Sequence, residues 1–278
     1  MNKIIEITHN STVHFGRAQD TLPRLVADRR TIAVTDENVV RACPALTDAF
    51  EHIIVHAGER SKTLSTAELL WREFLTRGID RSCFVLGIGG GVVTDMAGFV
   101  AATYMRGVPF GFVPTTLLGM VDASIGGKNG VDLDGYKNIV GTFSQPRFVV
   151  CDVALLASLP DREFRAGLAE VIKAAIIGDA DLFNLLGNTT FTQLRTDTAL
   201  LERVVESAIR VKARVVATDE RETGERRKLN LGHTLAHAIE KIVPQYNHGE
   251  AVAVGLHRMA EVASRMGLLD RTDADRIQ

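Results

Sequence analysis

The sequence contains few cysteines and no long apolar run. Its three cysteines, Cys43, Cys83 and Cys151, are far apart and form no Cys-x-x-Cys pair. An odd number of isolated cysteines excludes a disulfide framework and is typical of a reducing compartment, so we expect a cytoplasmic protein. No apolar stretch approaches the roughly 20 residues of a membrane-spanning helix. The first residues carry charges inside their apolar run, unlike a signal peptide.

The sequence also lacks an excess of charge of either sign. Its 32 Lys and Arg residues and 34 Asp and Glu residues give a formal net charge of −2. Because there is no bulk basic field, neither nucleic acid nor a membrane surface is an expected partner. Any anion must be bound by local basic residues. The 278 residues suffice for one large domain or two smaller ones.

Short β-branched runs alternate with helical patterns in the first half of the chain. Strands are expected at residues 31–35, 52–56, 83–86 and 109–113, and helices at 65–77 and 95–105. This alternation predicts a parallel α/β sheet, in which ligands bind at the carboxyl ends of the strands.

The second half of the chain has almost no strand signal after residues 148–151. Helices are expected at residues 160–173, 197–216, 230–242 and 250–266. We therefore predict two domains, an α/β domain of residues 1–155 and an all-helical domain of residues 156–278. The polar, Gly-rich segment 122–138 is predicted to be a loop or hairpin that lines a cleft. The last helical pattern stops without a C-cap, so we expect a chain truncated at its C-terminus.

A Gly-rich turn follows the strand expected at residues 83–86. Residues 87–95 have the sequence GIGGGVVTD. Glycines let the backbone approach a pyrophosphate closely, and the start of the following helix offers free N–H groups. The spacing differs from the usual dinucleotide fingerprint, GxGxxG. A tight turn with close helix packing therefore explains the turn about as well as a phosphate site does.

Polar residues follow several of the neighbouring strands. Asp36 follows the first strand, Glu59 and Lys62 follow the second, and Thr115 and Thr116 follow the fourth. Alone, these residues would be interpreted as surface charges or as a helix cap. Together with the Gly-rich turn they mark four successive strand ends, which favours a nucleotide site where Asp36 binds ribose hydroxyls.

Several side chains of the second half are candidate metal ligands. His233 and His237 are spaced i, i+4 on one helix face, and His248 follows within sixteen residues. A lone helical histidine is more often packed or solvated, but three so close together favour a metal site. Glu170 adds a carboxylate only if the helices converge, which spacing cannot show.

Basic residues are the candidates for binding an anionic substrate. They are Arg106, Lys128, Lys137, Lys173, Lys212, Arg226, Arg227 and Lys228. Lys128, between Gly-Gly and Asn-Gly, and Lys173, one turn after Glu170, are the least typical of a surface. A nicotinamide and a metal in one chain predict oxidation of an alcohol that the metal polarises.

Taken in order, these segments resemble the 3-dehydroquinate synthases. The resemblance is carried by residues 58–59 with Lys62, then 89–95, 114–118, 122–128, 137–138, 167–173, 219–222, 229–237 and 248–253. It implies an N-terminal α/β domain that binds NAD and a helical C-terminal domain that carries zinc, with cobalt as an alternative metal. The implied reaction converts 3-deoxy-D-arabino-heptulosonate 7-phosphate, a sugar phosphate with a carboxylate, to 3-dehydroquinate and phosphate. It proceeds by transient oxidation, elimination, re-reduction and aldol closure.

The resemblance also implies roles for individual residues. Zinc ligands would be Glu170, His233 and His248, so His237 changes from a candidate ligand to a substrate contact. The substrate pocket would comprise Asp122, Lys128, Lys173, Lys212, Arg226, Asn230 and His237. NAD would contact Asp36, Asn38, Glu59, Lys62, Gly90, Gly91, Val92, Val93, Thr94, Asp95, Thr115 and Thr116, with Lys128, Lys137 and Asn138 toward the substrate. Arg106 would reach the neighbouring subunit's phosphate site, which implies a homodimer.

The sequence leaves three alternatives open. One is another sugar-phosphate cyclase that makes a cyclitol, although Arg226 and Lys128 together favour a substrate with a carboxylate. A second is a metal-dependent polyol dehydrogenase, which would release NADH and would not need a lysine-rich pocket. The third is a truncated, non-catalytic remnant that binds NAD, because family members extend further and there carry a lysine that contacts phosphate.

Overall fold

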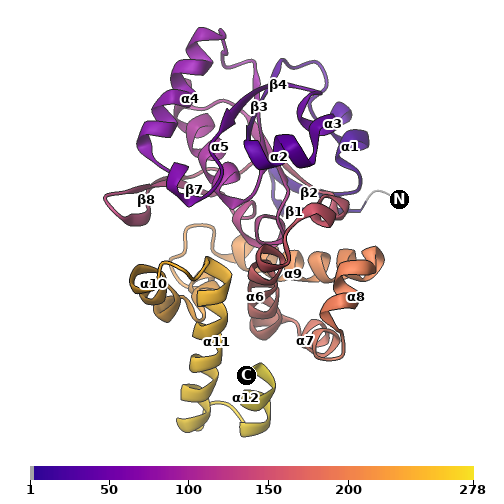
Figure 1. The fold of residues 1–278 in the computed structure, drawn as a ribbon, viewed down its shortest axis with the longest axis vertical. Helices are drawn as coiled ribbons and strands as arrows, with labels where there is room; N and C mark the ends of the chain where they lie inside the picture. The colour runs from indigo at the N-terminus through magenta and orange to yellow at the C-terminus, as the bar shows by residue number, and fades with distance from the viewer. Residues whose placement is uncertain (1–2) are drawn as a thin grey trace. The chain divides into compact units, whose positions relative to one another are not determined.

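The computed structural model describes residues 3–278, and the chain divides into two compact units, Met1–Leu159 and Pro160–Gln278 (Figure 1). Each unit is considered by itself. The division lies close to the predicted domain boundary after residue 155, which stays a prediction.

Unit 1 is built on a seven-stranded sheet with the strand order β1-β2-β9-β6-β5-β3-β4. Its strands are β1 (Ile4–Thr8), β2 (Ser11–Phe15), β3 (Thr31–Asp36), β4 (Glu51–Val55), β5 (Phe84–Gly89), β6 (Phe110–Pro114) and β9 (Phe148–Cys151). Only β1 and β2 pair antiparallel, while all other neighbours are parallel. The carboxyl ends of β4, β3, β5 and β6 therefore share one edge of the sheet.

Helices cover both faces of this sheet (Figure 1). One face packs on α1 (Ala18–Leu25), α2 (Glu37–Ala42) and α3 (Pro44–Thr47), where Leu22, Val39 and Leu46 form a core with Leu86 and Ile88 of β5. The other face packs on α5 (Gly91–Thr103), which contacts β5 and β6 and is flanked by α4 (Leu64–Thr76). The result is a three-layer α/β/α arrangement, as the alternating pattern predicts.

The polar segment 122–138 forms most of a hairpin, which settles the predicted choice between loop and hairpin. It begins at the π-helical turn η3 (Gly119–Ala123) and continues into the antiparallel strands β7 (Lys128–Leu133) and β8 (Tyr136–Phe143). The hairpin packs against α5. Short 3-10 turns lie at η1 (Glu59–Ser61), η2 (Tyr104–Arg106) and η4 (Val153–Ser158).

Unit 2 is helical, and no strand occurs between residues 160 and 278. Its elements are α6 (Asp161–Gly178), α7 (Ala180–Gly187), α8 (Phe191–Thr196), α9 (Thr198–Thr218), η5 (Glu225–Asn230), α10 (His233–Ile242), α11 (His248–Arg265) and α12 (Arg271–Ile277). Helix α6 packs on α7, α9 and α11, and α10 packs on α11. Among residues 3–278, no helix has the length and apolar character required to cross a membrane.

Three helix starts differ by two residues or more from the predicted positions. Helix α5 begins at Gly91 rather than at residue 95, because the Gly-rich turn itself enters the helix. Helix α10 begins at His233 rather than at residue 230, since Gly232 adopts a left-handed conformation with φ of 79° and interrupts the helix. Helix α11 begins at His248 rather than at residue 250, because Asn247 caps it.

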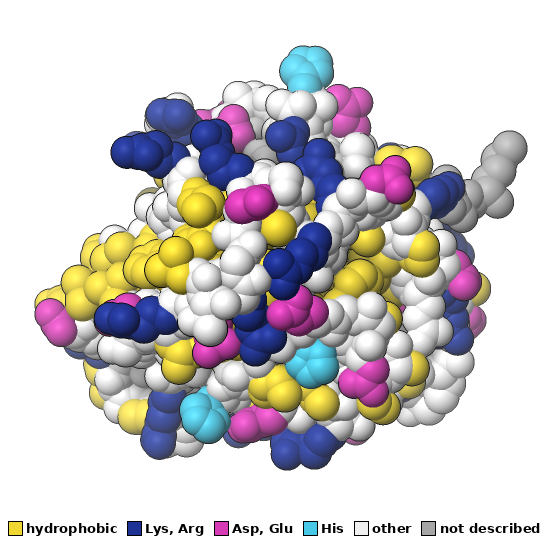
Figure 2. Space-filling view, turned by 90° about the horizontal axis from the view of Figure 1, so that it is seen from above, with side chains coloured by type: hydrophobic (Ala, Val, Ile, Leu, Met, Phe, Trp, Pro, Cys, Tyr) yellow, Lys and Arg dark blue, Asp and Glu magenta, His cyan; other side chains and the backbone are white. Residues whose placement is uncertain are grey.

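Charge is mixed over the surface, as the balanced composition predicts. On the face that Figure 2 shows, Lys and Arg side chains are interspersed with Asp and Glu. No single continuous basic field covers that face.

Candidate functional site

Three of the predicted metal ligands lie together in unit 2. Glu170 comes from α6, His233 from the first residue of α10 and His248 from the first residue of α11, and their donor atoms all lie within 4.8 Å of one another. Glu170 Oε1 is 3.7 Å from His233 Nε2 and 3.5 Å from His248 Nε2. Donor atoms around a tetrahedral zinc are about 3.3 Å apart, given bonds of about 2.0–2.1 Å. The donor set and its spacing therefore fit zinc.

Two glycines allow the helices that carry these ligands to approach each other. A Cβ at Gly249 would lie 2.1 Å from the backbone oxygen of Ala166 on α6, and a Cβ at Gly255 would lie 2.2 Å from the oxygen of Gly232. Both distances are far below van der Waals contact. Helix α11 therefore packs directly on the backbone of α6 and on the turn before His233, which brings the three ligand side chains together.

The electrostatics of the cluster are dominated by Glu170, whose side chain is 1% exposed and pairs with Lys173 one turn later. Burial by itself disfavours the charged form of His248, but hydrogen bonding and charge from Glu170 and Glu240 raise its pKa to about 9. Burial, together with the charge of Lys173, lowers the pKa of His233. The pKa values of the two imidazoles are thus shifted in opposite directions although both rings face the same carboxylate.

Sequence reasoning missed several residues that support the cluster. Glu240 Oε1 lies 3.4 Å from His248 Nδ1, and the Leu231 backbone oxygen lies 3.2 Å from His233 Nδ1. Helical periodicity offered a signal for Glu240, because positions 233, 237 and 240 fall on one face of α10.

A second missed group fixes the start of α11. Asn247 and Glu250 form a capping box, in which the Asn247 side chain accepts from Glu250 N and the Glu250 side chain accepts from Asn247 N. Arg162 of α6 donates to both oxygens of Glu250 at 2.7 Å. The backbone on both sides of His248 is therefore held by contacts independent of its ring.

His237 lies next to the cluster but outside it. Its ring centroid is 5.5 Å from that of His233, and the residue is exposed. It is not among the grouped donors. The i, i+4 ligand pair that spacing suggested is therefore not the set that the fold assembles, and the role of His237 as a substrate contact stays a prediction.

Three predicted substrate residues are buried cations. Lys173 on α6, Lys212 on α9 and Arg226 in η5 are 3%, 8% and 2% exposed. Both α9 and η5 pack against α6. Charged side chains are rarely buried without a compensating partner. Lys173 pairs with Glu170, and Arg226 donates to the Glu220 backbone oxygen, so both cations have partners within unit 2.

The loop before η5 is shaped by its acidic residues. Asp219 accepts hydrogen bonds from the backbone N–H groups of Thr223, Gly224 and Arg226, and those of Gly224 and Thr223 lower its pKa. The fourth predicted substrate residue of unit 2, Asn230, is exposed and donates to Glu222 Oε1 at 2.5 Å.

In unit 1, the predicted cofactor residues lie along the carboxyl edge of β4, β3, β5 and β6. Asp36 ends β3, Glu59 and Lys62 follow β4, Gly90 follows β5, and Thr115 and Thr116 follow β6. Asp36 Oδ1 caps α2 by accepting from Asn38 N and Val39 N at 2.8 and 3.0 Å. Among residues 3–278, its Oδ2 accepts no hydrogen bond.

The start of α5 is open to an anion. Gly90 is the N-cap and offers no side-chain cap, and the first five residues of the helix are Gly91, Val92, Val93, Thr94 and Asp95. A Cβ at Gly90 would lie 3.0 Å from Thr116 Cγ2. The first-turn N–H groups and the helix dipole suit a phosphate, so this turn fits a pyrophosphate.

A buried lysine joins three segments beside this turn. Lys62 is 4% exposed, and its Nζ donates at 2.5 Å to both Asp95 Oδ2 and Asn138 Oδ1. Burial opposes its charge, but the carboxylates of Asp95 and Glu59 outweigh it and raise the pKa of Lys62. Lys137 Nζ lies 3.8 Å from Glu59 Oε1. The network links η1, α5 and β8.

The remaining predicted residues of unit 1 lie at the start of the hairpin and in η2. Asp122 lies in η3, and Lys128 is the exposed first residue of β7. Arg106 is exposed and follows Met105, and both have positive φ, 65° and 50°.

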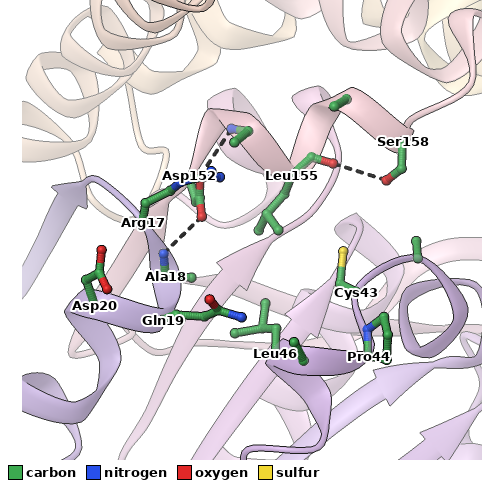
Figure 3. A pocket seen from close by; sticks show the side chains of 14 residues that line it. Arg17, Ala18, Gln19, Asp20, Cys43, Pro44, Leu46, Asp152, Leu155 and Ser158 are labelled. Carbon is green, nitrogen blue, oxygen red and sulfur yellow. Dashed lines mark hydrogen bonds and ion pairs between the residues drawn. The ribbon is translucent and has the colours of Figure 1, made fainter.

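A hollow of about 490 Å³ also lies at the carboxyl edge of β9, and none of the predicted site residues lines it (Figure 3). Asp152 lines this hollow and accepts hydrogen bonds from Ala18 N at 3.0 Å and from Ala154 N at 3.1 Å. Burial, aided by the Asp152 charge, raises the pKa of the Cys43 thiol in this hollow, so Cys43 is not an activated nucleophile.

Comparisons with known proteins agree with this arrangement. Sequence models of the 3-dehydroquinate synthase N-terminal and C-terminal domains match residues 52–166 and 167–278. The 3-dehydroquinate synthase of Desulforamulus reducens is 46% identical over 259 residues, which cover 90% of this chain and 72% of that protein.

Solved structures of sugar-phosphate cyclases share the fold. A 2-epi-5-epi-valiolone synthase from Streptomyces hygroscopicus, solved with NAD+ and Zn2+ bound, superposes with a TM-score of 0.89 at 29% identity, over 100% of this chain and 80% of that one. A 2-deoxy-scyllo-inosose synthase complexed with carbaglucose-6-phosphate, NAD+ and Co2+ gives a TM-score of 0.85 at 28% identity, over 100% and 79%. From the domain matches and the identity to curated relatives, the chain belongs to the 3-dehydroquinate synthase family.

Proposed function

We propose that this chain is an enzyme that converts 3-deoxy-D-arabino-heptulosonate 7-phosphate to 3-dehydroquinate and phosphate, a step of the shikimate pathway. Family membership at 46% identity supports this lyase activity over that of the cyclitol synthases, which share 28–29% identity. The reaction comprises transient oxidation, phosphate elimination, re-reduction and aldol closure.

One observation carries the choice of substrate. Three buried cations, Lys173, Lys212 and Arg226, lie on α6 and on elements that pack against it. A polyol has no charge for them to bind, whereas the proposed substrate carries a carboxylate and a phosphate. Lys and Arg form their strongest hydrogen bonds with such oxygens.

We propose NAD for the sheet edge of unit 1 and zinc, or cobalt, for the cluster in unit 2. When bound, the metal would polarise a substrate hydroxyl, and NAD+ would accept a hydride from the carbon that bears this hydroxyl. The Gly-rich turn before α5 would hold the pyrophosphate, and Asp36 Oδ2 would accept from a ribose hydroxyl. Glu170, His233 and His248 would hold the metal. Because these side chains are fixed on three packed helices, they would act by positioning the metal and not by forming a covalent bond to the substrate.

We also propose a homodimer and a cytoplasmic location. Met105 and Arg106 both occupy the left-handed region that side chains other than glycine seldom adopt, and they present the Arg106 side chain to solvent. Such a conformation is suited to a contact with a second copy of the chain, which supports a homodimer. The three cysteines are free thiols, which supports a cytoplasmic location.

The proposal is tested by adding substrate to the zinc-loaded protein with a catalytic amount of NAD+. Phosphate should be released continuously without net NADH, because the cofactor is returned to its oxidised form. Glycerol and a sugar phosphate without a carboxylate serve as control substrates. Stoichiometric NADH without phosphate would identify a dehydrogenase, and phosphate release from the second control alone would identify a cyclitol synthase.

A further inference from the structure

His248 is contacted by carboxylates on both sides of its ring. Its Nε2 lies 3.5 Å from Glu170 Oε1, and its Nδ1 lies 3.4 Å from Glu240 Oε1. The Glu240 side chain is only 6% exposed. A carboxylate so deeply buried is costly unless its neighbours compensate for it. Glu240 belongs to none of the groups assigned so far to the metal, the substrate or the cofactor.

His233 is held in the same manner. Its Nδ1 faces the Leu231 backbone oxygen at 3.2 Å, and its Nε2 points to Glu170 Oε1 at 3.7 Å. In both histidines Nδ1 is therefore engaged by an oxygen outside the cluster, while Nε2 faces the shared carboxylate. Metal-binding histidines characteristically donate their second ring N–H to a carboxylate or backbone carbonyl, which fixes the tautomer and the ring orientation.

The geometry points to Glu240 as a positioning residue of the metal centre: it accepts the Nδ1–H of His248 and thereby directs the Nε2 lone pair of that ring toward the metal. This inference rests on the proposed metal site. Glu240 is not itself one of the ligands, because it lies on the Nδ1 side of the ring and outside the grouped donors Glu170, His233 and His248.

Glu240 acts on the ring rather than on the backbone of His248. The backbone is fixed separately by the Asn247–Glu250 capping box and by Arg162. Removal of Glu240 should therefore leave the start of α11 folded and release only the rotation and tautomer of the imidazole. Helix α10 thus supplies both a ligand, at its first residue, and the group that orients the next ligand, seven residues later.

The test compares zinc affinity in the unmodified 278-residue chain and in Glu240→Ala, Glu240→Gln and Glu261→Gln. Glu261 lies on α11 but thirteen residues beyond His248, about 20 Å along the helix, and pairs with exposed arginines. Affinity is measured by competition with a chromophoric chelator, and the visible spectrum of the Co2+-loaded protein reports on ligand geometry.

We expect Glu240→Ala to weaken zinc binding by about 10- to 100-fold and to alter the Co2+ spectrum. Glu240→Gln keeps an acceptor oxygen and should lose less, and Glu261→Gln should match the unmodified chain. If Glu240→Ala does not fold, the Gln variant supplies the comparison.

Unchanged zinc affinity and an unchanged Co2+ spectrum in the folded Glu240 variants would overturn the role of Glu240 while leaving the metal site intact. Failure of the unmodified chain to bind zinc would instead overturn the metal site itself, and the role of Glu240 with it.

Discussion

The proposed cofactor edge of unit 1 and the metal cluster of unit 2 are constructed from different parts of the chain. At the sheet edge, the candidate groups are backbone N–H groups of the Gly-rich turn and short side chains, and most come from positions just after a strand. In the cluster, three side chains from three helices converge, and glycine contacts between helix backbones set their spacing.

Because the two sites are built differently, different kinds of substitution should abolish ligand binding at each. A backbone site is lost when a side chain intrudes, whereas a side-chain cluster is lost when a ligand or a partner charge is removed.

Removal of a metal ligand should have the largest effect. His233→Ala should weaken zinc binding by more than the about 10- to 100-fold typical of an outer contact, because it deletes one of three clustered donors. His237→Ala is the matched control, since it removes an exposed neighbour on the same helix. Metal content by elemental analysis checks this. Loss of zinc in His237→Ala, with retention in His248→Ala, would restore the i, i+4 pair as the ligand set.

In unit 1, Asp95→Asn should destabilise the fold and weaken NAD binding. It leaves the Lys62 cation buried without its carboxylate, and breaking a buried ion pair costs about 3–5 kcal/mol. Glu68→Gln, which breaks the exposed pair with Arg72, is the control and should change stability by about 0.5 kcal/mol or less. Denaturant unfolding measures both. Equal effects in the two variants would show that the Lys62 network is no more important than a surface pair.

Zinc affinity should depend on pH through His248. The pKa of His248 in the metal-free chain is about 9, above its ordinary value of 6.5. The charged ring therefore stabilises the metal-free fold fully below about pH 6.5. This contribution is lost as the pH rises through 9. Zinc must displace the Nε2 proton, so apparent affinity should rise about tenfold per pH unit between about 7 and 9. Titrations at several pH values measure the slope, which His237→Ala should retain. A flat profile would contradict the assignment of His248 as a ligand.

A methyl group at Gly90 should weaken NAD binding by about fivefold to tenfold, a cost of about 1 kcal/mol. The added Cβ would also lie 3.0 Å from Thr116 Cγ2. Gly90→Ala by itself therefore cannot separate blocked approach to the pyrophosphate from crowding against Thr116. Thr116→Ser removes that methyl group and serves as the background for a second measurement. NAD titration of Gly90→Ala in both backgrounds separates the causes. Recovery of affinity with Thr116→Ser would show that crowding within the protein, and not blocked approach to the pyrophosphate, caused the loss.

Most of the sheet of unit 1 can be predicted from the sequence. The runs at 31–35, 52–56, 83–86, 109–113 and 148–151 correspond to β3, β4, β5, β6 and β9. Buried parallel strands are short, nearly uninterrupted apolar runs, and their ends are marked by the residues that come directly after them. For this reason the sequence predicts Asp36, Gly90 and Thr115 at one edge of the sheet. The strands β1 and β2 were not predicted, because β1 is an edge strand of only five residues and β2 has polar Ser11, Thr12 and His14 among its apolar residues.

Which of the candidate ligands lie together depends on how the helices pack. Spacing favoured His233 and His237, since periodicity describes only one helix at a time. Glu170 lies more than sixty residues from either, and its approach to His233 and His248 depends on the packing of α11 on α6 at Gly249 and on the turn at Gly232 through Gly255. Likewise, Glu240 shares the His233 face of α10, but only the crossing of α10 and α11 places it against the ring of His248. Distances between helices are set by packing, which a local pattern does not encode.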